Sequence, residues 1–223
     1  MSPDDVDELR PARADHLPPA AAVPRAAAHA LVVQRDADAA AVLAEQERLR
    51  QRGLPAPSLS AIVLKASALA LREHPGVNAS WRDGAIVEHA RIHVGVTVAA
   101  AHTLRVPVVR DADRLSLAAL GWVVDELARQ VRAGQLQARA TRGATFTVAD
   151  LGGLRVDPSI AVLEPPQAAI LTVDAALTRG PAGGTRPLRL RLTYDARVLD
   201  RSEASAFVGS VADAFEVPLA LAS

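Results

Sequence analysis

The chain has 223 residues, half of them hydrophobic, with 25 basic and 25 acidic side chains, so it can bury a core and is not a disordered polymer. Its zero net charge and 3% aromatic content argue against a nucleic-acid partner, which needs basic and stacking side chains. Because cysteine is absent, thiol nucleophiles, disulfides and cysteine-based zinc sites are excluded. No apolar run reaches the ~18 residues of a membrane helix and the acidic start is no secretory signal, so we expect a cytoplasmic protein without a membrane partner.

Patterns along the first half of the chain predict an irregular arm followed by strands and helices. Residues 1–24 are rich in Pro, Ala and Asp without a period, so we expect an N-terminal arm there and the core over 25–223. The expected elements are a strand over 27–34, a helix capped by Asp36 or Asp38 and ending at Gly53, a helix over 61–73 capped by Ser58 or Ser60, and strands over 92–98 and 105–109.

The second half continues the alternation of helices and strands. The expected elements are a helix following Ser116 over 117–131, short strands near 144–149, 159–163 and 167–173, a loop over 180–185, an alternating strand over 186–194 and a final helix from Ser202. Helices and strands interleave irregularly. We therefore predict the α/β class, as a single mixed-sheet domain rather than a doubly wound parallel sheet.

No short motif identifies a reaction. The sequence has no glycine-rich phosphate loop, no His-Glu-x-x-His and no Gly-x-Ser-x-Gly. His89 and His93 would lie on one face of a strand about 13 Å apart, too far to share a metal ion. Both are interpreted as ordinary core or surface histidines and His102 as a solvated loop residue, so no metal site is predicted.

Seven ordered segments between Val23 and Leu221 carry the strongest signal. They span 69–80, 92–98, 106–113, 115–118, 144–152, 164–171 and 194–200. In this order and spacing, the chain resembles the catalytic core of the dihydrolipoamide acyltransferases, the transferase subunit of 2-oxo acid dehydrogenase complexes. The resemblance implies the fold of chloramphenicol acetyltransferase, a homotrimer, and an active-site channel between subunits. Coenzyme A or acyl-CoA would enter one end as a substrate, with no covalently bound cofactor.

The same resemblance raises questions of assembly and domain content. The family's lipoyl domain and peripheral-subunit-binding domain are not recognisable, so a freestanding core is expected. Near the C-terminus, Leu219 and Leu221 resemble a tail that joins trimers into a cubic assembly. Alternatively, this tail folds back onto its own subunit.

The family's catalytic positions carry different residues here. Its Asp-His-Arg-x-x-Asp-Gly motif spans 195–201, and Ala196 replaces the histidine that acts as general base on the thiol of coenzyme A. Ala149 replaces the hydroxyl residue that donates to the oxyanion, and Asp150 replaces the next asparagine. Arg201 replaces the motif's glycine. The family's chemistry is therefore expected to be impaired.

Other family positions are kept. Asp195, Arg197 and Asp200 are expected either to order the turn around position 196 for catalysis or only to maintain the fold. Four residues are expected to line the substrate channel: Leu104, Arg105, Thr147 and Asp150. Arg105 departs from an apolar family residue; it either faces the channel, where it would suit an anionic ligand, or points to solvent.

Three hypotheses follow for function. The first is a divergent acyltransferase that passes an acyl group from a thioester to a small-molecule acceptor, for example in specialised metabolism. The second is a non-catalytic structural paralogue of the transferase core. The third is a channel recruited for a reaction other than acyl transfer. The sequence leaves open whether the chain is an enzyme.

Overall fold

The computed structural model describes residues 8–10, 29–100, 103–150, 163, 165–175 and 187–216. Within these residues a six-stranded sheet has the order β2-β11-β10-β9-β5-β8. Its strands are β2 (Ala30–Ala37), β5 (Val94–Val96), β8 (Val108–Val109), β9 (Phe146–Asp150), β10 (Ala169–Ala175) and β11 (Leu188–Asp195). β9 runs parallel to both β5 and β10, whereas the other pairs are antiparallel, so the predicted mixed sheet is confirmed.

Two smaller sheets flank the central one. The first has the order β1-β4-β3, and the second is the hairpin β6-β7. Their strands are β1 (Glu8–Arg10), β3 (Ala79–Arg82), β4 (Ala85–Glu88), β6 (Val98–Ala100) and β7 (Thr103–Arg105). β1 falls within the expected arm and pairs with β4; the rest of residues 1–24 lies outside the described residues.

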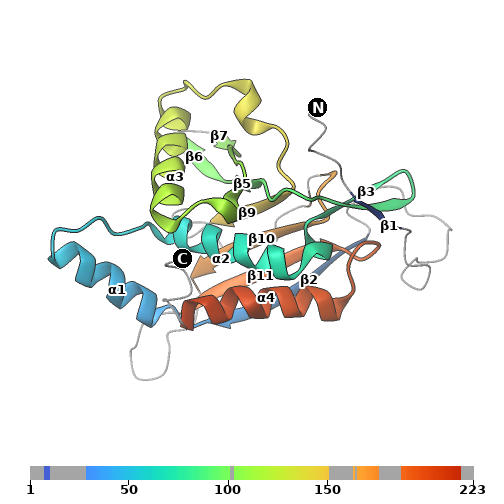
Figure 1. The fold of residues 1–223 in the computed structure, drawn as a ribbon, viewed down its shortest axis with the longest axis horizontal. Coiled ribbons are helices and arrows are strands. Elements are labelled where there is room, and N and C mark those ends of the chain that lie inside the picture. The colour runs from blue at the N-terminus through green and yellow to red at the C-terminus, as the bar shows by residue number, and fades with distance from the viewer. Residues whose placement is uncertain are drawn as a thin grey trace.

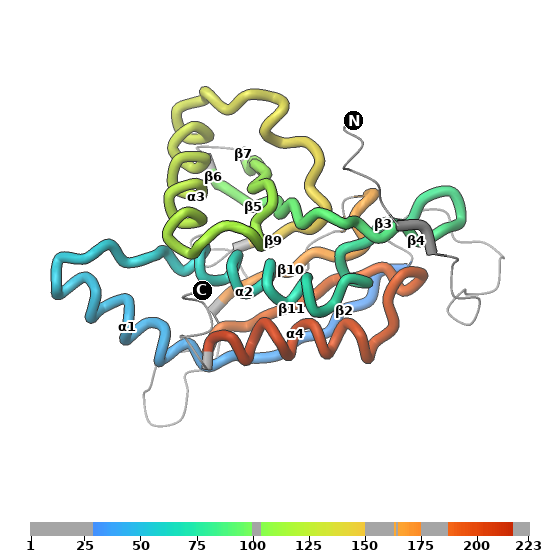
Figure 2. Tube along the Cα trace, viewed as in Figure 1, coloured from blue at the N-terminus to red at the C-terminus, as the bar shows by residue number. Residues whose placement is uncertain are grey.

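The helices lie mainly on one side of the central sheet. They are α1 (Ala40–Gln51), α2 (Leu59–Glu73), α3 (Leu117–Arg132) and α4 (Arg201–Glu216), with short 3₁₀ helices η3 (Pro75–Val77), η4 (Ala112–Arg114) and η5 (Ala138–Thr141). Figure 1 shows α2 and α4 side by side in front of the sheet. Figure 2 shows α3 beside the β6-β7 hairpin, and α3 also packs against α2. None of the helices in the described part of the chain is long and apolar enough to cross a membrane.

The core lies between the central sheet and the α2–α4 pair. Alternate residues of β9 and β11 point toward the helices, which places Phe146 and Tyr194 among the fully buried side chains. The ring of Phe146 meets that of Phe207 from α4 edge-on, with 5.5 Å between centroids. α2 is buried along most of its length, as its apolar sequence predicts.

The starts of α2 and α3 agree with the predicted capping residues, whereas α1 has Ala39 as its N-cap, and Asp38 accepts a hydrogen bond from the Ala40 N–H at 2.8 Å. The Ser58 hydroxyl accepts a hydrogen bond from the Ala61 N–H at 3.3 Å, and α2 begins at the next residue. Ser116 caps α3 in the same way. The stretch after each serine is therefore helical for a local reason that the sequence carries.

Several strand boundaries differ from the predictions. The strand expected over 92–98 is two strands, β5 and β6, which belong to different sheets. The strand expected over 105–109 is also divided, because Pro107 has no N–H to donate to a ladder. β2 lies three residues further along than the predicted strand over 27–34. The predicted strand over 159–163 and the loop over 180–185 lie outside the described residues except for Leu163, which is in no strand.

Candidate active site

The turn from Asp195 to Asp200 links β11 to α4 and is closed by its own ion pair. The Asp195 carboxylate accepts hydrogen bonds from Arg197 Nη2 at 2.6 Å and Nε at 3.0 Å, and from the Arg197 backbone N–H at 3.0 Å. The Val198 and Leu199 N–H groups donate to the Asp195 carbonyl. Arg197 also stacks on Trp81 of β3, with its guanidinium carbon 4.8 Å from the ring centroid. The turn is therefore rigid on both its backbone and its side-chain sides.

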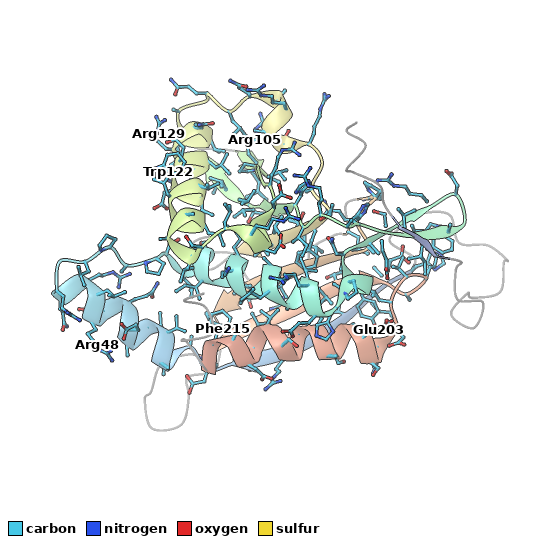
Figure 3. The ribbon with its side chains drawn as sticks, viewed as in Figure 1. Arg48, Arg105, Trp122, Arg129, Glu203 and Phe215 are labelled. Carbon is cyan, nitrogen blue, oxygen red and sulfur yellow. The ribbon has the colours of Figure 1, made fainter. Side chains whose placement is uncertain are left out.

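Asp200 begins α4. Its Oδ1 accepts a hydrogen bond from the Glu203 N–H at 2.8 Å, and Glu203 Oε2 accepts from the Asp200 N–H at 3.4 Å. This reciprocal pair is a capping box, which satisfies backbone donors at the helix start. Figure 3 labels Glu203 in the first turn of α4. The helix begins at Arg201, one residue earlier than predicted, because Asp200 rather than a later residue forms the cap.

Ala196 is held by the backbone alone. Its N–H donates to the His29 carbonyl at 2.9 Å, which ties the turn to the start of β2. The methyl side chain can neither donate, accept nor carry a proton. The structure thus contains an ordered turn with no acid–base group at position 196.

β9 presents Thr147 and Ala149 on the face of the sheet that points away from α2 and α4. The Thr147 hydroxyl donates to Gln167 Oε1 at 2.8 Å. Ala149 is 3% exposed and packs with Ile170 and Leu163. Asp150 ends the strand, and its side chain lies outside the described atoms. The surroundings of the Ala149 methyl are apolar.

Positions 149 and 196, which the resemblance predicts to be catalytic, are far apart within one chain. Ala149 pairs with Thr172 of β10, which in turn pairs with Arg191 of β11. Ala196 lies five residues beyond Arg191. Two strand spacings sideways and five residues lengthwise correspond to roughly 20 Å. One chain therefore does not bring positions 149 and 196 together.

Leu104 and Arg105 lie on β7 of the β6-β7 hairpin and are both exposed, Leu104 by 51%. Figure 3 shows Arg105 near α3, whose Trp122 is also exposed. Val106, which follows Arg105, and the Thr147 hydroxyl both lie close to Gly95, so β7 leads towards the Thr147 side of the sheet. Whether Arg105 faces a channel stays a prediction, because exposure on a single chain fits both alternatives.

The two histidines do not lie on one strand as predicted, because β4 ends at Glu88 and β5 begins at Val94. His89 Nε2 lies 2.6 Å from the Ser80 hydroxyl, and His93 Nδ1 accepts from the Asp111 N–H at 3.1 Å. No group of three or more His, Asp or Glu side chains in the described ranges is arranged to hold a metal ion. His102, Leu219 and Leu221 lie outside those ranges.

Sequence reasoning missed two contacts that shape the site. Trp81 stacks on Arg197, and Gln167 accepts from Thr147. Trp81 directly follows one of the seven matching segments and Gln167 lies inside another. No spacing rule joins residues so distant in the chain, so only the folded sheet reveals these pairs.

A mixed sheet with two long helices on one face and a tight Asp195–Asp200 turn defines an α/β domain of the acetyltransferase type. A chloramphenicol acetyltransferase has the same fold, with a TM-score of 0.57 and 14% identity over 83% of this chain and 87% of that one. The family model for the 2-oxoacid dehydrogenases acyltransferase (catalytic domain) matches residues 6–222. The chain belongs to this acyltransferase family.

The similar proteins come from 2-oxo acid and related complexes. The acetyltransferase component of the acetoin cleaving system of Bacillus subtilis is 32% identical over 169 residues, which are 74% of this chain and 42% of that protein. A dihydrolipoamide acetyltransferase of Azotobacter vinelandii, studied for the catalytic roles of a serine, a histidine and an asparagine, has a TM-score of 0.76 at 29% identity over 86% of this chain and 83% of that one. The cubic core of a pyruvate dehydrogenase complex has the same values. The chain spans less than half the length of the Bacillus relative.

Proposed function

We propose that the chain binds coenzyme A or an acyl-CoA in a channel between the subunits of a trimer, and that histidine-dependent acyl transfer is impaired. The observation that carries this proposal is Ala196 inside a fully ordered Asp195–Asp200 turn. Relatives are transferases by name, and one was studied for its serine and histidine. The family resemblance aligns Ala196 with such a histidine and Ala149 with the hydroxyl residue.

The expected impairment is large. Loss of a general base costs roughly 10²–10⁴-fold in rate, and loss of an oxyanion donor about 10²–10³-fold. Residues that act together are not additive, so a combined loss of roughly 10⁴–10⁵-fold is the conservative figure. Asp150 next to Ala149 would further oppose a negative oxyanion if its carboxylate faced the channel.

The separation of positions 149 and 196 supports a site shared between chains. Groups roughly 20 Å apart cannot act on the same carbonyl, whereas a neighbouring subunit can bring its own position 196 to position 149. The solved cubic core of a related complex shows that such domains assemble, and we extend this to a trimer here. The exposed Leu104 and Arg105 would line this channel, together with Thr147 and Asp150.

Titration calorimetry with acetyl-CoA, combined with a steady-state assay for release of free coenzyme A, tests the proposal. We expect saturable binding with nearly undetectable transfer to dihydrolipoamide. A rate within about tenfold of the median enzyme value of ~10 s⁻¹ would refute the impairment. Absence of binding would favour the second hypothesis, a structural paralogue without catalysis.

A mixing experiment tests the shared site. Chains carrying only Ala196→His and chains carrying only Ala149→Ser are unfolded, mixed and refolded together. A site between chains then has both groups at some interfaces, so the mixture should exceed the mean rate of the two single variants. The double variant serves as the positive control. A mixture no faster than that mean, beside an active double variant, would place both positions in one chain's site.

Assembly and domain limits belong to the same proposal. We propose an N-terminal arm over residues 1–24 and a core over residues 25–223. We also propose that the chain forms trimers, and that Leu219 and Leu221 join these trimers into a cubic assembly. Light scattering at micromolar concentration should give at least a trimer. Monomers would contradict the shared channel, and a clean trimer would contradict only the cube.

A further inference from the structure

A cavity of about 490 Å³ lies between the C-terminal end of α2, the segment after β4 and η4. This volume is within the usual range for small-molecule sites. Its polar lining consists of Arg72, Asn78, Glu88, His89, Asp113 and Arg114, and the rest of the lining is apolar. Neither position 149 nor position 196 lines it, and Ala149 lies on the other face of the sheet from α2. The cavity is therefore separate from the proposed acyl channel.

The walls of this cavity are held in place by polar contacts. Asn78 Nδ2 donates to the carbonyls of His89 and Arg91 at 2.9 and 3.0 Å. Arg91 in turn donates to both Asp111 oxygens, at 2.9 and 2.6 Å. These bonds connect the segment after β4 to the residue that precedes η4, where Asp111 has a left-handed backbone with φ 47°. Two walls that are distant in sequence are thereby fixed relative to each other before any ligand binds.

Asn78 lines this cavity with an amide that is fixed in place. The residue is 1% exposed, and both of its N–H donors are used by the two carbonyls, which fixes the orientation of the amide. Its Oδ1 has no hydrogen-bond partner in the described part of the chain. That oxygen is itself buried, so Asn78 fixes the cavity wall through its two donated hydrogen bonds and does not offer its oxygen to a ligand.

The charges around the cavity are of both signs. Glu88 and Asp113 favour a cation, as does the C-terminal end of α2, where the helix dipole is negative. Arg72 and Arg114 favour an anion, and neither forms a hydrogen bond or ion pair with a side chain among the described residues. A simple anion would be repelled by the carboxylates and a simple cation by the guanidinium groups.

We propose that this cavity binds a small zwitterion with an ammonium group and a carboxylate, the chemistry of a free amino acid. The ammonium group binds the carboxylate of Asp113, and the ligand's carboxylate binds Arg72 and Arg114. The apolar lining contacts the remainder of the ligand. This site is independent of the acyl-transfer proposal and does not require it.

Calorimetry on the full chain tests the proposal, with each proteinogenic amino acid titrated singly up to about 10 mM. At least one should bind saturably, and its N-acetyl and carboxamide derivatives should bind at least about tenfold more weakly, because each lacks one charge. Arg114→Gln and Asp113→Asn should each weaken binding by a similar factor, while Arg132→Gln, on the exposed face of α3, should leave it unchanged.

Two results would overturn the proposal. One is that none of the amino acids binds in this range to a chain whose melting profile shows it to be folded. The other is binding that both cavity variants leave unaltered. Acetyl-CoA titrations of the same variants separate the two sites, because their affinity for acetyl-CoA should match that of the parent chain whether or not the acyl proposal holds.

Discussion

Placing a histidine at position 196 and a serine at position 149 gives the most direct test of the proposed impairment. We predict that Ala196→His with Ala149→Ser produces acyl transfer from acetyl-CoA above the parent rate. The turn is already ordered around position 196, because Asp195 binds Arg197 and the Ala196 N–H binds the His29 carbonyl. An imidazole added there would therefore enter a rigid frame.

The backbone conformation at Arg201 does not prevent this gain in activity. Arg201 replaces the family's glycine, and a glycine is required only where the backbone is left-handed. Arg201 is the first residue of α4 and is not among the described non-glycine residues with positive φ, which are Asp83 and Asp111. The motif's last position is therefore compatible with an arginine backbone, and the departure at 201 does not by itself block the rescue.

The expected gain is about 10²-fold, the lower end of a general-base contribution. A serine at 149 adds less to the rate. Ala149 is 3% exposed and its neighbours Ile170 and Leu163 are apolar, so an unpaired serine hydroxyl there would lower the stability of the fold by about 1–3 kcal/mol. The hydroxyl becomes useful only when the reacting oxyanion accepts from it.

Steady-state release of coenzyme A is the assay, with Ala196→Gln plus Ala149→Ser as the matched control because glutamine cannot act as a base. The gain should rise with pH through about 6.5, where imidazole loses its proton and becomes a base. An equal gain in the glutamine control, or no gain in a folded variant that binds acetyl-CoA, would refute the reasoning and indicate a remodelled channel.

The remaining predictions concern the supports of the two sites. Asp195→Asn removes the charge that binds Arg197, so the free energy of unfolding in urea should fall by about 2–4 kcal/mol, since the Asp195 side chain is only 6% exposed; a change below about 1 kcal/mol would contradict this. Gly95→Ala should lower the free energy of unfolding by about 1–3 kcal/mol in the same measurement, because the added Cβ would lie 2.8 Å from Val106 Cγ1 and 3.0 Å from Thr147 Oγ1. An unchanged urea midpoint would show that these two side chains move aside at no cost in stability. Hydrogen bonds from Arg91 lower the pKa of Asp111 below 3.8, so this carboxylate stabilises the fold above that pH and the contribution is lost as the pH falls through the lowered value. Urea midpoints from pH 5 downward should therefore fall more steeply for the parent than for Asp111→Asn, and parallel curves would exclude the contribution.

The elements predicted well are those with a local cause. α2 and α3 follow Ser58 and Ser116, whose hydroxyls accept from N–H groups three residues later. β11 alternates between the core and the opposite face, so a period of two residues is visible in its sequence. In each case the signal and the structure it specifies lie within a few residues of each other, which is why sequence alone suffices.

The elements predicted less well depend on distant partners. The run over 92–98 looks like one strand, but Gly95 pairs with β9 and β8 whereas Val98 pairs with Arg105 in a separate hairpin. The Thr97 N–H donates to the Val148 carbonyl at the division. The period of a strand does not indicate which neighbour each residue pairs with, so the change of partner is not visible in the sequence.

The candidate site shows the same division between local and distant contacts. The contacts that order the turn come from Asp195, Arg197, Asp200, Trp81, Glu203 and the backbone. Among the described residues, position 196 contributes a hydrogen bond through its backbone N–H. Replacing a histidine by alanine at that position therefore leaves the connections of the turn intact and removes only the acid–base group. A matching motif predicts the turn because the turn is local. It does not predict activity, because under the proposed mechanism activity depends on one side chain that the turn does not need and on position 149, which lies roughly 20 Å away in the same chain.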